Sequence, residues 1–173
     1  GVSIYFAESI DKIGENAQEI KPNLMSVVPR LLEKVFNKIN AKGSELTGLK
    51  RVLFFWAIKL GERYEPYQSN GFWYEFQLKV ARKLIFSKWK AALGGELNTM
   101  VSGSAALHPR SARIFCASGM MIMEGYGLTE TSPIVSVAMY SGKNFKLGTV
   151  GKPISNVEVK IAEDGEILIK GPN

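Results

Sequence analysis

The chain is organised around one stretch, Met123-Glu124-Gly125-Tyr126-Gly127-Leu128-Thr129-Glu130-Thr131-Ser132-Pro133. The residues at its start, Met120-Met121-Ile122-Met123, are apolar and predict a short buried strand. A second apolar run begins at Pro133-Ile134-Val135. The polar cluster between them therefore forms a tight connection at the end of a strand, which is where open α/β sheets place their ligands.

The residues of this connection allow two interpretations. Glycines let a backbone approach a bound group closely, and exposed N–H groups can face an anion. Thr129 could then donate to a phosphate oxygen while Glu130 holds the metal that neutralises it. The alternative is an ordinary turn, with Tyr126 in the core and Glu130 in solvent. A bare Gly-Tyr-Gly favours the turn, whereas the full run favours a ligand site.

The first part of the chain alternates between strand and helix patterns. Residues 3–6 and 24–28 are predicted strands, and residues 12–20 are a predicted helix. Pro29 opens a second helix, because proline fits the first helical position. This order predicts an α/β fold, a mostly parallel sheet with helical crossovers.

A helical insertion is expected over about residues 30–95. Two sets of apolar residues recur at helical spacing and predict two core-facing stripes. They are Leu49, Val52, Leu53, Trp56 and Leu60 in the first, and Trp73, Phe76, Val80 and Leu84 in the second. Lysines and arginines are interspersed among them.

Another strand–loop–helix unit follows the insertion. Residues 97–101 predict a strand that runs into the small-residue loop Ser102-Gly103-Ser104-Ala105-Ala106. Pro109 begins the next helix, and His108 is expected to cap it or to lie on the surface. Such a loop can accept an anion or a flat ring, although many loops of this composition bind nothing.

The pattern changes to antiparallel β near residue 140. Residues 134–139 predict a strand, residues 142–144 a turn and residues 148–153 a glycine-punctuated loop. Alternating residues over 157–161 and 166–169, joined by Asp164-Gly165, predict a hairpin. We therefore expect an α/β subdomain over residues 1–139 and the start of an antiparallel β subdomain over 140–173.

Composition and charge restrict the class of protein. The 173 residues are 46% hydrophobic and 22% charged, as in an ordinary globular domain, and no apolar run has the length of a transmembrane helix. Cys116 is the only cysteine, so a reducing compartment, the cytoplasm, is expected. The net charge is +6, and residues 30–90 carry thirteen bases against five acids. These bases could face a membrane, nucleic acid or an anionic cofactor, or simply solvate helix faces.

Several runs together resemble one family. Gly125-Tyr126-Gly127-Leu128-Thr129-Glu130-Thr131 resembles the signature of the adenylate-forming enzymes: acyl-CoA synthetases, luciferases and the adenylation domains of peptide synthetases. Residues 100–107, 148–153 and 165–172 resemble segments that flank this signature, in the family's order. Residues 5–9 and Val28-Pro29-Arg30 resemble the long-chain fatty acid–CoA ligase branch, as does the helical insertion.

The resemblance implies a ligase that uses ATP, Mg²⁺ and coenzyme A with a long-chain fatty acid substrate. It implies that Tyr126 faces adenine, that Thr129 bonds the α-phosphate and that Glu130 ligates Mg²⁺, with Thr129 and Glu130 catalytic. The implied nucleotide-binding residues are Ser102, Gly103, Ser104, Ala105, Glu124, Gly125, Tyr126, Gly127 and Thr129.

Parts of the family pattern have no counterpart in this sequence. The Ser/Thr/Gly-rich phosphate loop, the ribose-binding Asp and the catalytic Lys of the C-terminal domain are absent. We therefore expect a piece of a longer enzyme, inactive alone, with apolar surfaces that favour self-association. The alternative is a non-enzymatic module whose basic helices dock on an anionic membrane or a partner. Both could hold at once, because a ligase for fatty acids gains from peripheral contact with the membrane near its substrate. A nucleic-acid role lacks a recognisable reading motif.

Overall fold

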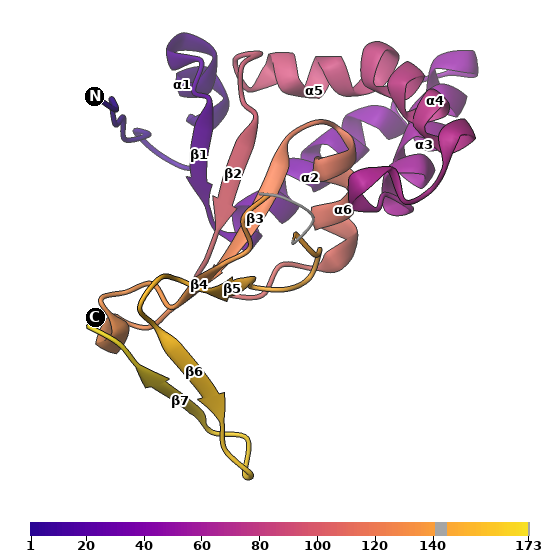
Figure 1. The fold of residues 1–173 in the computed structure, drawn as a ribbon. Coiled ribbons are helices and arrows are strands. Elements are labelled where there is room, and N and C mark those ends of the chain that lie inside the picture. Colours follow the sequence, from indigo (N-terminus) through magenta and orange to yellow (C-terminus); the bar gives the residue numbers. More distant parts are fainter. Residues whose placement is uncertain (141–144, 173) are drawn as a thin grey trace.

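The computed structural model describes residues 1–140 and 145–172, and its centre is a five-stranded sheet (Figure 1). Strands β1 (Leu24–Val27), β2 (Thr99–Ser102) and β3 (Met121–Tyr126) are parallel neighbours in that order. Each β-to-β connection passes through helices, as parallel pairing requires. The predicted α/β class, with parallel strands and helical crossovers, is confirmed.

Antiparallel strands complete the sheet and form a separate hairpin. β4 (Ser136–Val137) pairs with β3, and β5 (Lys152–Pro153) pairs with β4. β6 (Glu158–Ile161) and β7 (Ile167–Lys170) form the predicted hairpin, which projects away from the helices in Figure 1. The turn expected at residues 142–144 lies outside the described residues, and the subdomain boundary at 139/140 stays a prediction.

Helices lie beside the parallel strands. α1 (Ile13–Ile20) precedes β1, and α2 (Pro29–Ser44) follows it with Pro29 at its first turn. The insertion between β1 and β2 continues with α3 (Gly48–Glu62), the short turn η1 (Pro66–Gln68), α4 (Phe72–Ala81), the π-helical turn η2 (Arg82–Phe86) and α5 (Ser87–Ala92). α6 (Pro109–Ala117) connects β2 to β3. No helix of the described chain is long and apolar enough to cross a bilayer.

One face of the sheet forms the core. Along β2 and β3 buried and half-buried residues alternate, because successive side chains of a strand point to opposite faces. Met100 and Ile122 on the buried face are almost fully covered, as are Ile114 and Phe115 on α6. This face positions the ends of β2 and β3 rigidly.

The strand predicted at residues 3–6 is wrong. The structure has no strand there, and Ile4 and Phe6 are 76% and 93% exposed. A strand needs a partner for its backbone groups, and no strand of the described chain pairs with these residues. The β-propensity of residues 3–6 is therefore not sufficient to form a strand, because no sheet edge lies beside them to accept their backbone hydrogen bonds.

The core-facing stripes predicted for the insertion are also wrong for most of their residues. On α3, Leu49 and Val52 are exposed, while Phe54, Ala57, Ile58 and Gly61 are buried with Leu60. The reason is close packing: Gly61 lies against Ile114, so that an added Cβ would be 3.4 Å from the Ile114 Cα. Small residues let α6 approach this side of α3, and that side becomes the core.

The same reversal occurs on α4. Trp73, Phe76 and Leu84 are exposed, whereas Tyr74 and Leu78 are buried. The Tyr74 hydroxyl donates to the Leu60 carbonyl oxygen at 2.8 Å and so satisfies its polar group inside the core.

Two ion pairs attach the insertion to α6. Glu62 pairs with Arg110 at 2.7 Å, and Glu65 pairs with Arg113 at 2.8 Å. Half-exposed pairs of this kind contribute little energy each, but they fix which side of α3 faces α6.

Candidate functional site

Two loops leave the sheet side by side at its carboxyl edge. Ser102 at the end of β2 is the register partner of Glu124 on the parallel strand β3. The loop of residues 103–108 and the loop of residues 127–133 therefore begin near each other, at the ends of these two paired strands. The structure thus brings together the two segments that the sequence analysis selected.

Glu124 is buried at this junction, with 9% of its surface exposed. One of its carboxylate oxygens accepts a hydrogen bond from the Leu107 backbone N–H at 3.3 Å, and the Gly148 backbone N–H lies near the same carboxylate. Burial raises the pKa of Glu124, and these two N–H groups oppose that rise. The Glu124 side chain therefore links β3 to the loop of residues 103–108.

Ser102 is buried beside it, at 1% exposure. Its hydroxyl oxygen has no hydrogen-bond partner within the described part of the chain. Ser102 and Glu124 share the core face of the sheet, because registered residues of parallel neighbours point to the same side. Their side chains are part of the interior, and the loops that they carry are outside it.

The loop of residues 127–133 is held from inside by Thr131, which the sequence analysis did not assign to the site. The buried Thr131 hydroxyl accepts from the Leu128 N–H at 3.0 Å and lies 2.9 Å from the Leu128 carbonyl oxygen, to which it can donate. The signal that could have found it is the three-residue spacing from Leu128, at which a threonine hydroxyl can bond back to the backbone.

Gly127 allows the same loop to close on itself. A Cβ built at Gly127 would overlap the carbonyl group of Pro133, so only glycine fits this approach. Gly125 differs, because its added Cβ would be 3.7 Å from the Ser136 carbonyl oxygen, an ordinary contact. One glycine of the signature is therefore required by the loop itself.

The remaining predicted residues are exposed or half-buried. Thr129 and Glu130 are exposed on the short turn η3 (Thr129–Thr131), and neither side chain makes a hydrogen bond or ion pair to another described residue. Ser104 and Ala105 are exposed, and Gly103 and Tyr126 are half-buried. Ser104 has a φ of +69°, which bends its loop sharply after β2. The site thus has a buried layer and an exposed layer.

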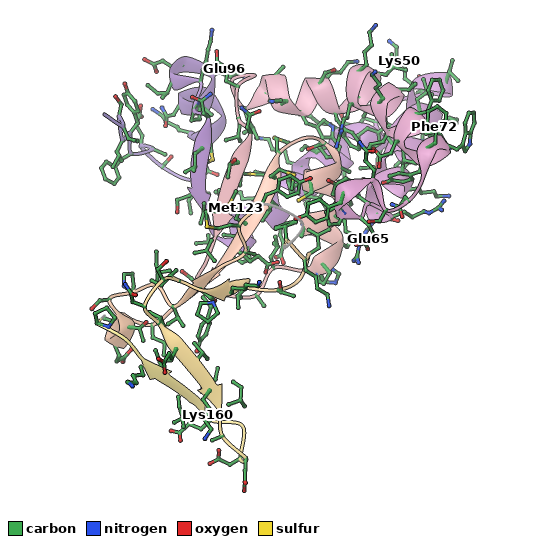
Figure 2. The ribbon with its side chains drawn as sticks, in the orientation of Figure 1. Lys50, Glu65, Phe72, Glu96, Met123 and Lys160 are labelled. Atoms are coloured by element: carbon green, nitrogen blue, oxygen red, sulfur yellow. The ribbon has the colours of Figure 1, made fainter. Side chains whose placement is uncertain are left out.

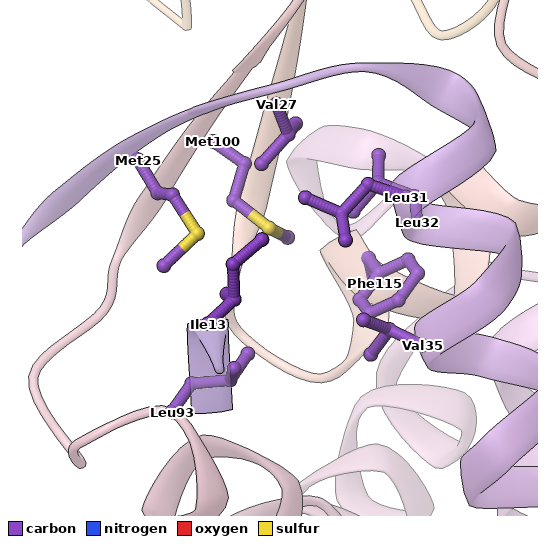
Figure 3. A pocket seen from close by; sticks show the side chains of 9 residues that line it. All are labelled: Ile13, Met25, Val27, Leu31, Leu32, Val35, Leu93, Met100 and Phe115. Atoms are coloured by element: carbon purple, nitrogen blue, oxygen red, sulfur yellow. The ribbon is translucent and has the colours of Figure 1, made fainter. Parts of the chain in front are cut away.

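Two cavities lie elsewhere in the molecule. The first, of about 10 Å³, lies in the apolar core beside β1 (Figure 3). Its lining residues are Ile13, Met25, Val27, Leu31, Leu32, Val35, Leu93, Met100 and Phe115. This volume has room for about one water molecule, so the cavity is a gap in packing and not a site for an acyl chain.

The second cavity, of about 240 Å³, lies between α2 and the start of α6, beside His108. The imidazole Nδ1 of His108 accepts from the Arg110 backbone N–H at 3.2 Å, so His108 caps α6 as predicted. Neither of these two cavities includes a predicted site residue.

The exposed carboxylate of this site suits Mg²⁺ that is already bound to the phosphates of a nucleotide. Within the described residues no three His, Cys, Asp or Glu side chains group to hold a metal. Mg²⁺, however, commonly takes one or two carboxylates and completes its shell with water and substrate phosphates. Glu130, whose exposed carboxylate is not paired with any described residue, is a donor of that kind.

The chain matches known proteins over nearly its whole length. The family model described as "AMP-binding enzyme" matches residues 1–173. A long-chain-fatty-acid–CoA ligase, FadD15 of Mycobacterium bovis, is 33% identical over 172 residues, which are 98% of this chain and 28% of that protein. Long-chain-fatty-acid–CoA ligase 5 of Rattus norvegicus is 31% identical over 184 residues, with 98% and 25% coverage. The chain thus spans about a quarter of the length of these relatives.

Solved structures share the fold at lower identity. A long-chain-fatty-acid–CoA ligase (FadD1) from Archaeoglobus fulgidus superposes with a TM-score of 0.57 at 17% identity, over 95% of this chain and 28% of that chain. An o-succinylbenzoate coenzyme A synthetase from Bacillus subtilis, in complex with ATP and magnesium, superposes with a TM-score of 0.51 at 17% identity, over 95% and 26%. At these identities the likeness shows the fold alone.

Proposed function

Because this chain belongs to the AMP-binding enzyme family, we propose that it forms part of a long-chain fatty acid–CoA ligase. The relatives that support this proposal are named long-chain-fatty-acid–CoA ligases and match nearly the whole chain. Since the chain spans about a quarter of their length, the proposed activity is that of a longer protein, and the chain alone is expected to be inactive.

The proposed reaction has two steps. A fatty carboxylate oxygen attacks the α-phosphorus of ATP, forming the acyl-adenylate and releasing pyrophosphate. The thiol of coenzyme A then attacks the acyl carbon, so that a thioester forms and AMP leaves with the bonding electron pair. In such transfers the protein contributes mainly positioning and electrostatic stabilisation.

This chain would supply the adenine, α-phosphate and Mg²⁺ side of the site. The observation that carries the proposal is that Thr129 and Glu130 are exposed, with no side-chain bond to the residues that the structure describes. They lie on a loop whose shape Thr131 and Gly127 maintain from inside. The Thr129 hydroxyl would donate to an α-phosphate oxygen, and Glu130 would hold Mg²⁺. Bound Mg²⁺ supplies charge neutralisation for the departing pyrophosphate.

The half-buried Tyr126 would offer its ring to adenine, next to the backbone of residues 102–105. Both Ser102 and Glu124 have buried side chains. Glu124 would act through the loop that it bonds to, and Ser102 through the loop that begins at the next residue. The backbone would approach the nucleotide closely at Gly103, Ser104, Ala105 and Gly125.

The test is fatty acid-dependent pyrophosphate release by the full-length protein that carries this chain. Glu130→Gln should lower the adenylation rate by roughly a hundredfold to a thousandfold, the usual range for removing one group that stabilises transition-state charge. Glu163→Gln, at an exposed residue of the β6–β7 turn, is the matched control and should not change the rate.

Two results would contradict the proposal. Pyrophosphate release with amino acids but not with fatty acids would exclude the long-chain assignment. An adenylation rate of Glu130→Gln equal to that of Glu163→Gln would remove Glu130 from the metal role.

We also propose a cytoplasmic location. The single cysteine of this chain supports it, because Cys116 is buried and forms no disulfide with the residues that the structure describes. Fractionation of cells that express the full-length protein would test the location, and recovery from an oxidising compartment would contradict it.

A further inference from the structure

The exposed side of α4 carries large aromatic residues that the fold does not use. Phe72, Trp73 and Phe76 are 86%, 69% and 52% exposed. The rings of Trp73 and Phe76 stack on each other with centroids 5.6 Å apart. Figure 2 shows Phe72 at the outer edge of the helices, away from the sheet. A patch of exposed aromatic side chains marks an interaction surface more often than a helix face that contacts only water.

Lysines continue the same helix face. The residues follow one another at spacings of three or four: Trp73, Phe76 and Lys79 on α4, and Lys83 on the π-helical turn η2 that continues it. This spacing places them along one side of the helical segment. We call these four residues together with Phe72 the α4 stripe. Lys79 and Lys83 are exposed, and neither forms an ion pair with another residue of the described ranges.

The surrounding insertion is strongly positive. Residues 48–92 contain nine lysines and arginines and three glutamates. Two of those glutamates, Glu62 and Glu65, are already paired with arginines of α6. The third, Glu75, lies on α4 four residues before Lys79 and offsets part of the nearby charge. The bases of the insertion still outnumber its acids, so the region around the α4 stripe attracts anionic surfaces.

We propose that the α4 stripe docks the protein on an anionic lipid surface. Protein interfaces are depleted in lysine at their cores, so a stripe that alternates aromatic rings with lysines fits a protein partner poorly. At a membrane the same mixture is favourable, because aromatic rings enter the headgroup region while lysine ammonium groups reach anionic headgroups. This inference does not depend on the proposed ligase activity.

Flotation of the full-length protein with lipid vesicles tests the charge contribution. Binding should be stronger to vesicles of phosphatidylcholine with phosphatidylserine than to phosphatidylcholine alone, and added salt should weaken it. Since each lysine near an anionic surface contributes on the order of fivefold in binding, the double variant Lys79→Ala, Lys83→Ala should bind roughly thirtyfold more weakly.

The matched control has the same charge change on the hairpin, which is far from α4 in Figure 1. Lys160→Ala with Lys170→Ala, both at exposed positions, should reduce binding much less. Equal losses in the two double variants would overturn the proposal, because binding would then follow net charge and not the α4 stripe. No binding to phosphatidylserine vesicles by the unmodified protein would also overturn it.

A second pair of variants tests the aromatic contribution. Trp73→Ala with Phe76→Ala should reduce vesicle binding by at least tenfold, since two large apolar side chains no longer enter the headgroup region. Ile161→Ala with Leu168→Ala removes apolar surface from exposed positions on the hairpin and should have little effect. Unfolding midpoints of both variants establish that each is folded, and unchanged binding by folded Trp73→Ala, Phe76→Ala would overturn the proposal.

Discussion

The two layers of polar side chains at the carboxyl edge of the sheet differ in what surrounds them. The buried layer of Ser102, Glu124 and Thr131 is covered by protein, and Glu124 and Thr131 bond to backbone groups of the loops. The exposed layer of Thr129 and Glu130 makes no such bonds to the described chain. We infer from this difference that the two layers have different roles. The buried side chains maintain the shape of the loops, and the exposed side chains are available to bind a ligand.

The strongest test of this division is Gly127→Ala. The added Cβ would overlap the Pro133 carbonyl group, and a backbone group cannot move aside as a flexible side chain can. We expect a loss of about 3 kcal/mol in the free energy of unfolding. A displacement of Thr129 and Glu130 by about 1 Å should lower adenylation by roughly a hundredfold. Denaturant unfolding and pyrophosphate release measure the two effects.

Gly125→Ala is the control for stability in the same signature. Gly125 does not have a positive φ, and its added Cβ would make only an ordinary contact with Ser136. The free energy of unfolding should therefore not fall. If both glycine variants lost the same stability, the overlap at Pro133 would not be the reason for Gly127.

The next test compares valine substitutions of one threonine from each layer. Thr131→Val leaves the Leu128 N–H without its acceptor and should cost about 1–2 kcal/mol in the free energy of unfolding. Thr129→Val removes an exposed hydroxyl and should change that free energy by less than about 0.5 kcal/mol, while lowering the adenylation rate. Equal stability of the two variants would contradict the division into layers.

The smallest expected effect concerns Glu124 and pH. The folded protein holds the pKa of Glu124 above its usual value, so the folded state binds the proton more readily than the unfolded state. The stability that this carboxyl group contributes is thus present below its ordinary pKa and declines as pH rises through the raised value. Glu124→Gln removes this dependence, because an amide does not titrate.

The measurement is the free energy of unfolding of both proteins between about pH 4 and pH 7. The difference between variant and unmodified protein should shift in favour of Glu124→Gln as pH rises, whatever its offset from the changed hydrogen bonds. A difference that does not vary with pH would show that the carboxyl group is not desolvated in the folded protein.

Local patterns were sufficient for most elements. The helices after Pro29 and Pro109, the cap at His108 and the hairpin around Asp164-Gly165 lie where the sequence predicts them. Each of these depends on neighbours in the chain: a proline at the first turn, a capping side chain, or alternation around a tight turn. For the same reason the two loops of the site could be located at strand ends.

Long-range packing decided what local patterns left open. α3 and α4 are apolar on more than one side, so their periodicity could not show which side meets α6. The small residue Gly61 decides it for α3, because it lets Ile114, fifty-three positions away, approach closely. The direction of Ser102 and Glu124 depends on which face of the sheet the helices cover, and residues 3–6 lack a strand because no strand edge receives them. The sequence by itself therefore determined the order of elements and the chemistry of the exposed loop around Thr129 and Glu130. Only the tertiary structure separated the side chains that shape that loop from those left free to bind, because burial is set by contacts between distant segments.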